Sequence, residues 1–175
     1  MTLALDTSAL LGRYLSGPHR RVVLDAMAAD PVWCAAALAR TEALGMVDRV
    51  CDLPTDGDRL RRALRDDWER IHVVPLDQRC LDRAAELTRE QPLRTVDALH
   101  LAAADRLPRP VTFVTFDPRQ IPVALALGFE VVRHDGTRFL VSRADGTSGN
   151  SRFTVRWLLG DASVTLDVIA DLDED

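Results

Sequence analysis

The stretch that decides the fold is TLALDTSALL, Thr2 to Leu11, near the start of a chain of 175 residues. Its apolar segment, Leu3 to Leu5, predicts a short buried strand that stops at Asp6. Thr7 or Ser8 is then expected to cap a helix. A buried strand that ends in an acid and leads into a helix is the first unit of an α/β pattern.

The same unit recurs along the chain. Helical patterns contain Glu42, then Leu60 to Ile71, Leu81 to Leu87, Thr95 to Leu107, and Ile121 to Leu127. Short apolar segments lie between them, at about 32–35, 73–74, 110–117 and 129–132. Continuously apolar strands that alternate with helices predict a mostly parallel sheet covered on both faces, an α/β sandwich. Its ligand site is expected beyond the carboxyl ends of the strands.

From His134 onward the pattern changes to a period of two. The segments RFLVSR, SRFTVRWLLG and ASVTLDVIADL alternate apolar and polar residues, with a hairpin-type turn at Gly160 and Asp161. We therefore expect a main domain over residues 1–133 and a β-hairpin-rich antiparallel appendage over 134–175 that ends in the acidic tail DLDED. The apolar face of such a hairpin needs a cover, either the main domain or a second subunit.

Composition excludes several classes of protein. No apolar run reaches membrane-spanning length and no basic leader precedes a cleavage site, so the expected location is the cytoplasm, with no membrane association. Cys34, Cys51 and Cys80 are widely spaced, which argues against disulfides and a thiolate zinc site. The chain has no lysine, so P-loop and Schiff-base chemistry are closed to it. The net charge of -5 does not suggest general nucleic-acid affinity.

Four acids fall where the predicted strands and helices meet, and each has an ordinary structural explanation. Asp97 in a first helical turn after a Thr95 cap, Asp6 in a strand-to-helix turn, Asp117 before a proline and Glu42 on a helix surface are all common. Their joint placement at one rim changes the interpretation. Carboxylates crowded together repel one another unless a hard divalent cation binds them. Magnesium is the expected ion, with manganese close behind.

The residues resemble a known family, the PIN domain, and within it the VapC-like toxin ribonucleases. The similar stretches are LALDTSALL, LARTEAL, TVDALHLAAA and FVTFDPRQIPVALALGFEVV, in this order over about the first three quarters of the chain. The resemblance implies a PIN-like three-layer sandwich and a metal-dependent endoribonuclease. It further implies an RNA substrate, a cognate antitoxin and a homodimer.

The resemblance also implies roles for individual residues. Asp6, Asp97 and Asp117 would hold the ion, and Glu42 would bind it through water or accept a proton. The hydroxyls of Ser8 and Thr115 would orient a carboxylate or a water. Candidate RNA contacts are Arg13 and Arg119. His100, one turn after Asp97, is better explained as a packed or hydrogen-bonded side chain than as a ligand.

The chain departs from the family pattern in two places. Ala35 to Ala37 stand where members often have a serine or threonine cap before the helix of the glutamate, and the appendage is absent from the simplest members. Two other functions compete with the nuclease. A phosphoacceptor or phosphatase domain would want a lysine, which is absent here, and a non-catalytic interaction module would not need the intact set of acids.

Overall fold

The computed structural model describes residues 1–51, 53–132, 138–143, 151–159 and 162–170. Its central sheet has the strand order β3-β2-β1-β4-β5-β6-β7-β8. The first five strands of that order pair in parallel, which confirms the predicted sheet. They are β1 (Thr2–Leu5), β2 (Trp33–Ala36), β3 (His72–Val74), β4 (Val111–Val114) and β5 (Glu130–Val132).

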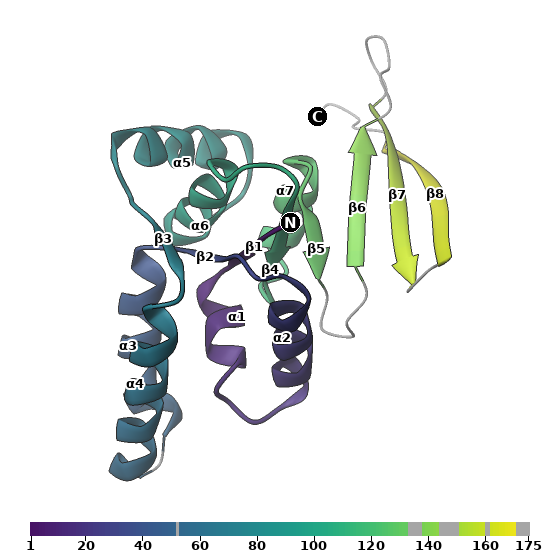
Figure 1. Cartoon of the computed structure of the whole chain (residues 1–175). Coiled ribbons are helices and arrows are strands. Elements are labelled where there is room, and N and C mark those ends of the chain that lie inside the picture. The colour runs from purple at the N-terminus through teal and green to yellow at the C-terminus, as the bar shows by residue number, and fades with distance from the viewer. Residues whose placement is uncertain (52, 133–137, 144–150, 160–161, 171–175) are drawn as a thin grey trace.

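Helices cover both faces of this sheet and complete three layers (Figure 1). On one side lie α1 (Thr7–Gly12), α2 (Pro18–Ala29), α3 (Leu38–Val50) and α4 (Pro54–Trp68). On the other lie α5 (Gln78–Glu90), α6 (Thr95–Asp105) and α7 (Gln120–Ala126). The helix α2 was not predicted from the sequence, and the others match the expected helical patterns.

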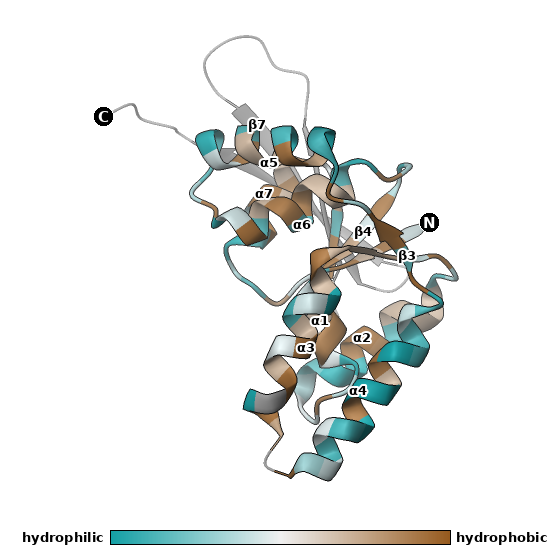
Figure 2. Cartoon of the chain, turned by 90° about the vertical axis from the view of Figure 1, so that its left-hand side faces the viewer, coloured by the Kyte–Doolittle hydropathy of each residue, from teal (hydrophilic) through white to brown (hydrophobic). Residues whose placement is uncertain are grey.

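The core explains why the strands are apolar throughout. In β1, Leu3 and Leu5 pack toward α1 and α2, whereas Ala4 packs toward α5 and α6, so successive side chains enter different layers. The amphipathic α5 alternates hydrophilic and hydrophobic residues, whereas α6 is mainly hydrophobic because it lies between α5 and the sheet (Figure 2). Asp97 and His100 are therefore exceptional polar residues on a buried helix.

The helix caps differ from the sequence expectation. Asp6, and neither Thr7 nor Ser8, is the N-cap of α1, and its carboxylate accepts a hydrogen bond of 2.8 Å from the amide of Ala9. Thr95 is the first residue of α6 and does not cap it. The predictions were wrong because α1 already begins at Thr7 and α6 at Thr95, so the capping position in each helix is the residue before. Ala37 caps α3 without a side-chain hydrogen bond, as the alanines before that helix suggest.

The C-terminal strands are antiparallel, as predicted, and extend the central sheet. They are β6 (Arg138–Arg143), β7 (Ser151–Leu159) and β8 (Ala162–Ala170). Val131 on β5 pairs with Phe139 on β6, and Phe153 on β7 pairs with Val168 on β8. The Gly160–Asp161 turn and the acidic tail 171–175 lie outside the described residues, and the domain boundary at residue 133 stays a prediction. Among the residues described, every helix is too short or too polar to cross a membrane.

Candidate active site

One cavity of about 450 Å³ is lined by all four acids that the sequence singled out. Asp6 directly follows β1, and Asp117 lies three residues beyond the end of β4, the strand next to it. Asp97 comes from the first turn of α6, and Glu42 comes from α3 on the other side of the sheet. The fold thus brings together side chains from four separate stretches at the carboxyl ends of the parallel strands.

Asp6 is the most enclosed of the four acids, with 2% of its surface exposed. Ser8 and Thr115 each donate a hydrogen bond of 2.7 Å to its carboxylate. The same two hydroxyls accept hydrogen bonds from backbone amides, Ser8 from Phe116 and Thr115 from Asp117. These bonds link the segment after β4 to the start of α1. Burial raises the pKa of Asp6 above its ordinary value, although these donors oppose the shift. An ionised Asp6 therefore benefits from any nearby positive charge.

Gln120 links Asp6 to Asp97 at the floor of the cavity. Its side-chain amide lies 3.3 Å from one oxygen of each carboxylate, and the residue is only 2% exposed. The other oxygen of Asp97, Oδ2, is buried and has no hydrogen-bond partner among the described residues. A buried carboxylate oxygen that lacks a donor is available to bind a cation.

Glu42 is held by two side chains from other elements. Thr7 donates a hydrogen bond to its Oε2, and the Nε2 atom of His100 lies 2.7 Å from the same oxygen. Burial disfavours the charged carboxyl, but these hydrogen bonds outweigh it and lower the pKa of Glu42. His100 is therefore a hydrogen-bonded buried residue, as the sequence favoured. No described residue forms a hydrogen bond with the other oxygen of Glu42, and the residue lines the cavity.

Asp117 is paired with Arg119, two residues further along the chain. The guanidinium contacts both carboxylate oxygens, at 3.1 and 2.8 Å, and the Arg119 backbone amide donates a third bond of 2.9 Å. Hydrogen bonding from Arg119 is the main reason why the pKa of Asp117 is lowered. Asp117 is thus a stable carboxylate that faces a cation supplied by its own loop.

The donor set suits a hard divalent ion, since it consists of carboxylate oxygens with one buried oxygen unpaired. As they stand, however, the described His, Cys, Asp and Glu side chains form no group of three that could hold a metal ion. In this arrangement Asp117 contacts Arg119, and Glu42 contacts His100. Rotation of Asp117 away from Arg119 would release a further oxygen ligand.

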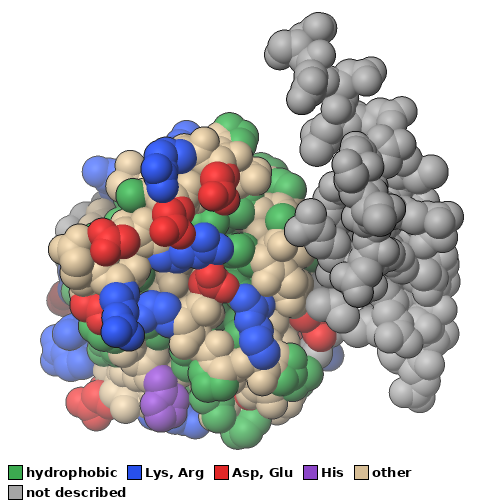
Figure 3. Space-filling model, turned by 90° about the horizontal axis from the view of Figure 1, so that it is seen from above, with side chains coloured by type: hydrophobic (Ala, Val, Ile, Leu, Met, Phe, Trp, Pro, Cys, Tyr) green, Lys and Arg blue, Asp and Glu red, His purple; other side chains and the backbone are tan. Residues whose placement is uncertain are grey.

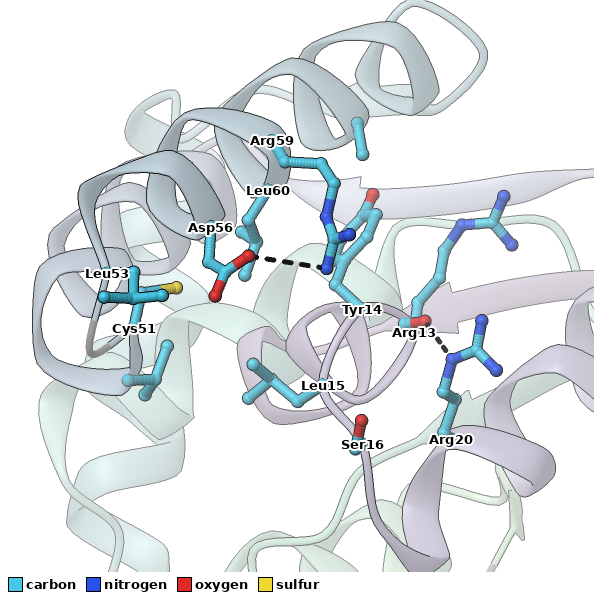
Figure 4. Close-up of a pocket in the computed structure, with 12 residues that line it drawn as sticks. Arg13, Tyr14, Leu15, Ser16, Arg20, Cys51, Leu53, Asp56, Arg59 and Leu60 are labelled. Atoms are coloured by element: carbon cyan, nitrogen blue, oxygen red, sulfur yellow. Dashed lines mark hydrogen bonds and ion pairs between the residues drawn. The ribbon is translucent and has the colours of Figure 1, made fainter.

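Arg13, the other candidate RNA contact, lies apart from the four acids. It lines a second, larger cavity of about 780 Å³ between the α1–α2 loop and α4 (Figure 4). Its guanidinium forms two hydrogen bonds with Asp67 on α4, of 2.6 and 2.9 Å, and Tyr14 donates to the same carboxylate. Arg13 therefore braces α1 against α4, and its assignment to RNA stays a prediction.

Positive and negative side chains interleave on the molecular surface above α5 and α6 (Figure 3). On these helices Arg83 pairs with both Glu86 and Asp105, and at their ends Arg106 pairs with Asp77. Such pairs neutralise one another locally, so this face presents no basic track to a polyanion.

Several residues of the cavity gave no signal in the sequence. Gln120 follows a turn and looks like an ordinary polar helix residue, yet its amide is buried between two acids. Thr7 was assigned to a cap, and it contacts Glu42 instead. Thr7 directly follows Asp6, so its place beside the acids becomes evident only once the start of α1 is known.

Comparisons with known proteins identify the family of the chain. The family model described as "PIN domain" matches residues 3–140. The chain is 33% identical over 127 residues to Ribonuclease VapC46 of Mycobacterium tuberculosis, an alignment that covers 71% of this chain and 82% of that protein.

Solved structures share the fold. VapC20 of Mycobacterium tuberculosis, described as a sarcin-ricin loop cleaving toxin, matches with a TM-score of 0.58 and 17% identity over 70% of this chain and 95% of its own. DNA-bound VapBC from Salmonella typhimurium matches with a TM-score of 0.58 and 16% identity over 75% and 98%. The matched family model, the sequence relative and the parallel sheet with acids at its carboxyl edge lead to one conclusion: the chain belongs to the PIN domain family, as a VapC-like member.

Proposed function

We propose that this VapC-like protein is a divalent-metal-dependent endoribonuclease and the toxin of a toxin–antitoxin pair. The observation that carries the proposal is the single cavity of about 450 Å³ lined by Asp6, Glu42, Asp97 and Asp117. The identity to a protein named as a ribonuclease supports the choice of RNA as substrate.

In this proposal Asp6, Asp97 and Asp117 hold one or two Mg²⁺ or Mn²⁺ ions. When bound, the metal supplies a water of lowered pKa and positive charge for the phosphate oxygens. Ser8 and Thr115 keep the Asp6 carboxylate oriented, since both hydroxyls are themselves fixed by backbone amides.

Glu42 is the group best placed to accept a proton from the attacking water. Its lowered pKa keeps it ionised at neutral pH. Hydrogen bonds to Thr7 and His100 fix one oxygen, whereas the other has no hydrogen-bond partner among the described residues. Arg119 is the candidate contact for the phosphate backbone, because it pairs with Asp117 of the cavity lining and a guanidinium suits phosphate geometry.

The test is cleavage of a single-stranded RNA by Asp6→Asn and Asp97→Asn variants in the presence of Mn²⁺. We expect both to lose activity and to remain folded. Asp77→Asn is the matched control, because Asp77 also caps a helix through its carboxylate yet lies outside the cavity. Wild-type cleavage by the Asp6 and Asp97 variants would overturn the proposal. A calorimetric titration with no divalent binding would favour a non-catalytic interaction module instead.

A cognate antitoxin and a homodimer are part of the same proposal. The antitoxin is supported by the fold that the chain shares with proteins solved as VapBC complexes from Rickettsia felis and Salmonella typhimurium. Co-expression with the product of the neighbouring open reading frame, followed by light scattering of the purified material, tests both. A monomer that does not retain that product would contradict them.

A further inference from the structure

The acids of the cavity are already bridged by two neighbouring residues of the chain, Arg119 and Gln120. The Arg119 guanidinium pairs with Asp117 and also lies 4.0 Å from Oδ2 of Asp97. Gln120 continues the chain of contacts from Asp97 to Asp6. Positive charge from Arg119 is therefore placed between two carboxylates that are proposed metal ligands.

The contact between Arg119 and Asp97 differs from an ordinary surface ion pair. Oδ2 of Asp97 is buried without a hydrogen-bond partner among the described residues, so the approach of a cation compensates a charge that would otherwise be uncompensated. The Arg119 side chain itself is 40% exposed. The guanidinium can therefore turn away from Asp97 and Asp117 into solvent.

We propose that Arg119 is a resident counter-cation: it occupies the acid cluster when no metal is present and leaves it when a divalent ion binds. The inference rests on the proposed metal-dependent function. A divalent ion and the guanidinium compete for the same oxygens of Asp97 and Asp117, because the two positive charges would repel each other at such a short distance. The residue lowers the affinity for metal while it keeps the empty site intact.

The test is a titration with Mn²⁺ alone, followed by electron paramagnetic resonance, of wild type, Arg119→Gln and Arg94→Gln. Arg94 is the matched control, since it lines the cavity of the four acids and acts on Asp117 through its charge, whereas the described contacts include no ion pair between Arg94 and these acids. We expect Arg119→Gln to bind Mn²⁺ about fivefold more tightly, the upper end for one exposed ion pair. Arg94→Gln should change the affinity less. The contrast should shrink at high ionic strength.

A second measurement follows the side chain directly. In nuclear magnetic resonance spectra, the Arg119 Nε–H signal, assigned by its loss in Arg119→Gln, should shift toward that of a solvated guanidinium when diamagnetic Mg²⁺ is added. An unmoved signal on a metal-loaded protein would overturn the inference. So would weaker Mn²⁺ binding by Arg119→Gln, unchanged binding, or an equal gain in Arg94→Gln. Absence of Mn²⁺ binding by the wild type would instead refute the proposed function.

Discussion

The Nε2 atom of His100 lies 2.7 Å from Oε2 of Glu42, although the two residues are 58 positions apart in the chain. His100 comes from a buried helix on one side of the sheet and Glu42 from a helix on the other. The bond therefore crosses the carboxyl edge of the sheet. It makes His100 a positioning residue for the proposed proton acceptor.

Replacement of His100 by alanine should lower kcat for RNA cleavage by about 10- to 100-fold, as for other groups that orient a catalytic carboxylate. KM should change little, because His100 is only 3% exposed and its Nε2 atom is engaged with Glu42. His100→Gln, which keeps a donor near the position of Nε2, should recover part of the rate. A rise in KM at unchanged kcat would show that the histidine serves substrate binding.

Asp6 should make the metal-free protein less stable as the pH rises. Its pKa in the folded state is raised above the ordinary value of 3.8, so the folded state binds more protons than the unfolded chain between those two values. The stability that this carboxyl contributes is complete below 3.8 and is lost as the pH rises through the folded pKa.

Asp6→Asn removes this dependence and retains a capping side chain. In the presence of a chelator, we expect the gain in melting temperature over wild type to be larger at about pH 7.5 than at about pH 4. A gain that is constant, or that shrinks toward neutral pH, would contradict the assignment.

Loss of the bridging amide should destabilise the metal-free protein. Gln120→Leu keeps the bulk of the side chain but removes the donor to Asp6 and Asp97, at an expected cost of about 1 to 3 kcal/mol. Gln78→Leu is the control, because Gln78 donates to a carboxylate at an exposed position. Urea unfolding measures both variants. Equal effects would show that burial between the acids is unimportant.

Arg13 offers a choice between a structural and an RNA-binding role. Because its guanidinium is engaged with Asp67, we expect Arg13→Gln to lower the free energy of unfolding by about 1 kcal/mol and to leave KM for RNA unchanged. Thermal unfolding and steady-state kinetics on the same preparation decide the matter. A raised KM with unchanged stability would support direct contact with RNA.

Truncation after Arg133 should leave β5 as an unpaired edge, since its partner β6 would be absent. Exposed strand edges pair with other chains. We expect a lower melting temperature and an increased mass in light scattering, whereas truncation after Ala170 should be close to wild type. An unchanged mass and melting temperature after the longer truncation would show that the extension does not support the sheet.

The sequence by itself determined the architecture and the order of the candidate site. Apolar segments such as Leu3 to Leu5 specify buried strands wherever they fold, because continuous apolar character suits a strand covered on both faces. Asp6 and Asp117 follow two strands that are parallel neighbours, so both lie at the carboxyl edge of the sheet. The presence of four acids at one cavity could therefore be predicted, although their roles remain proposals.

The tertiary structure alone decided which polar groups face those acids. The sequence carried no signal for Gln120 and named Arg119 and His100 without their partners, because these contacts depend on how α6 and α7 pack over the sheet. Hydrogen bonds are directional and short, so they follow from the relative placement of whole elements. The pattern of apolar residues determines which helices and strands form. The exact placement of these elements, and with it the hydrogen bonds of the site, depends on side-chain packing across the core.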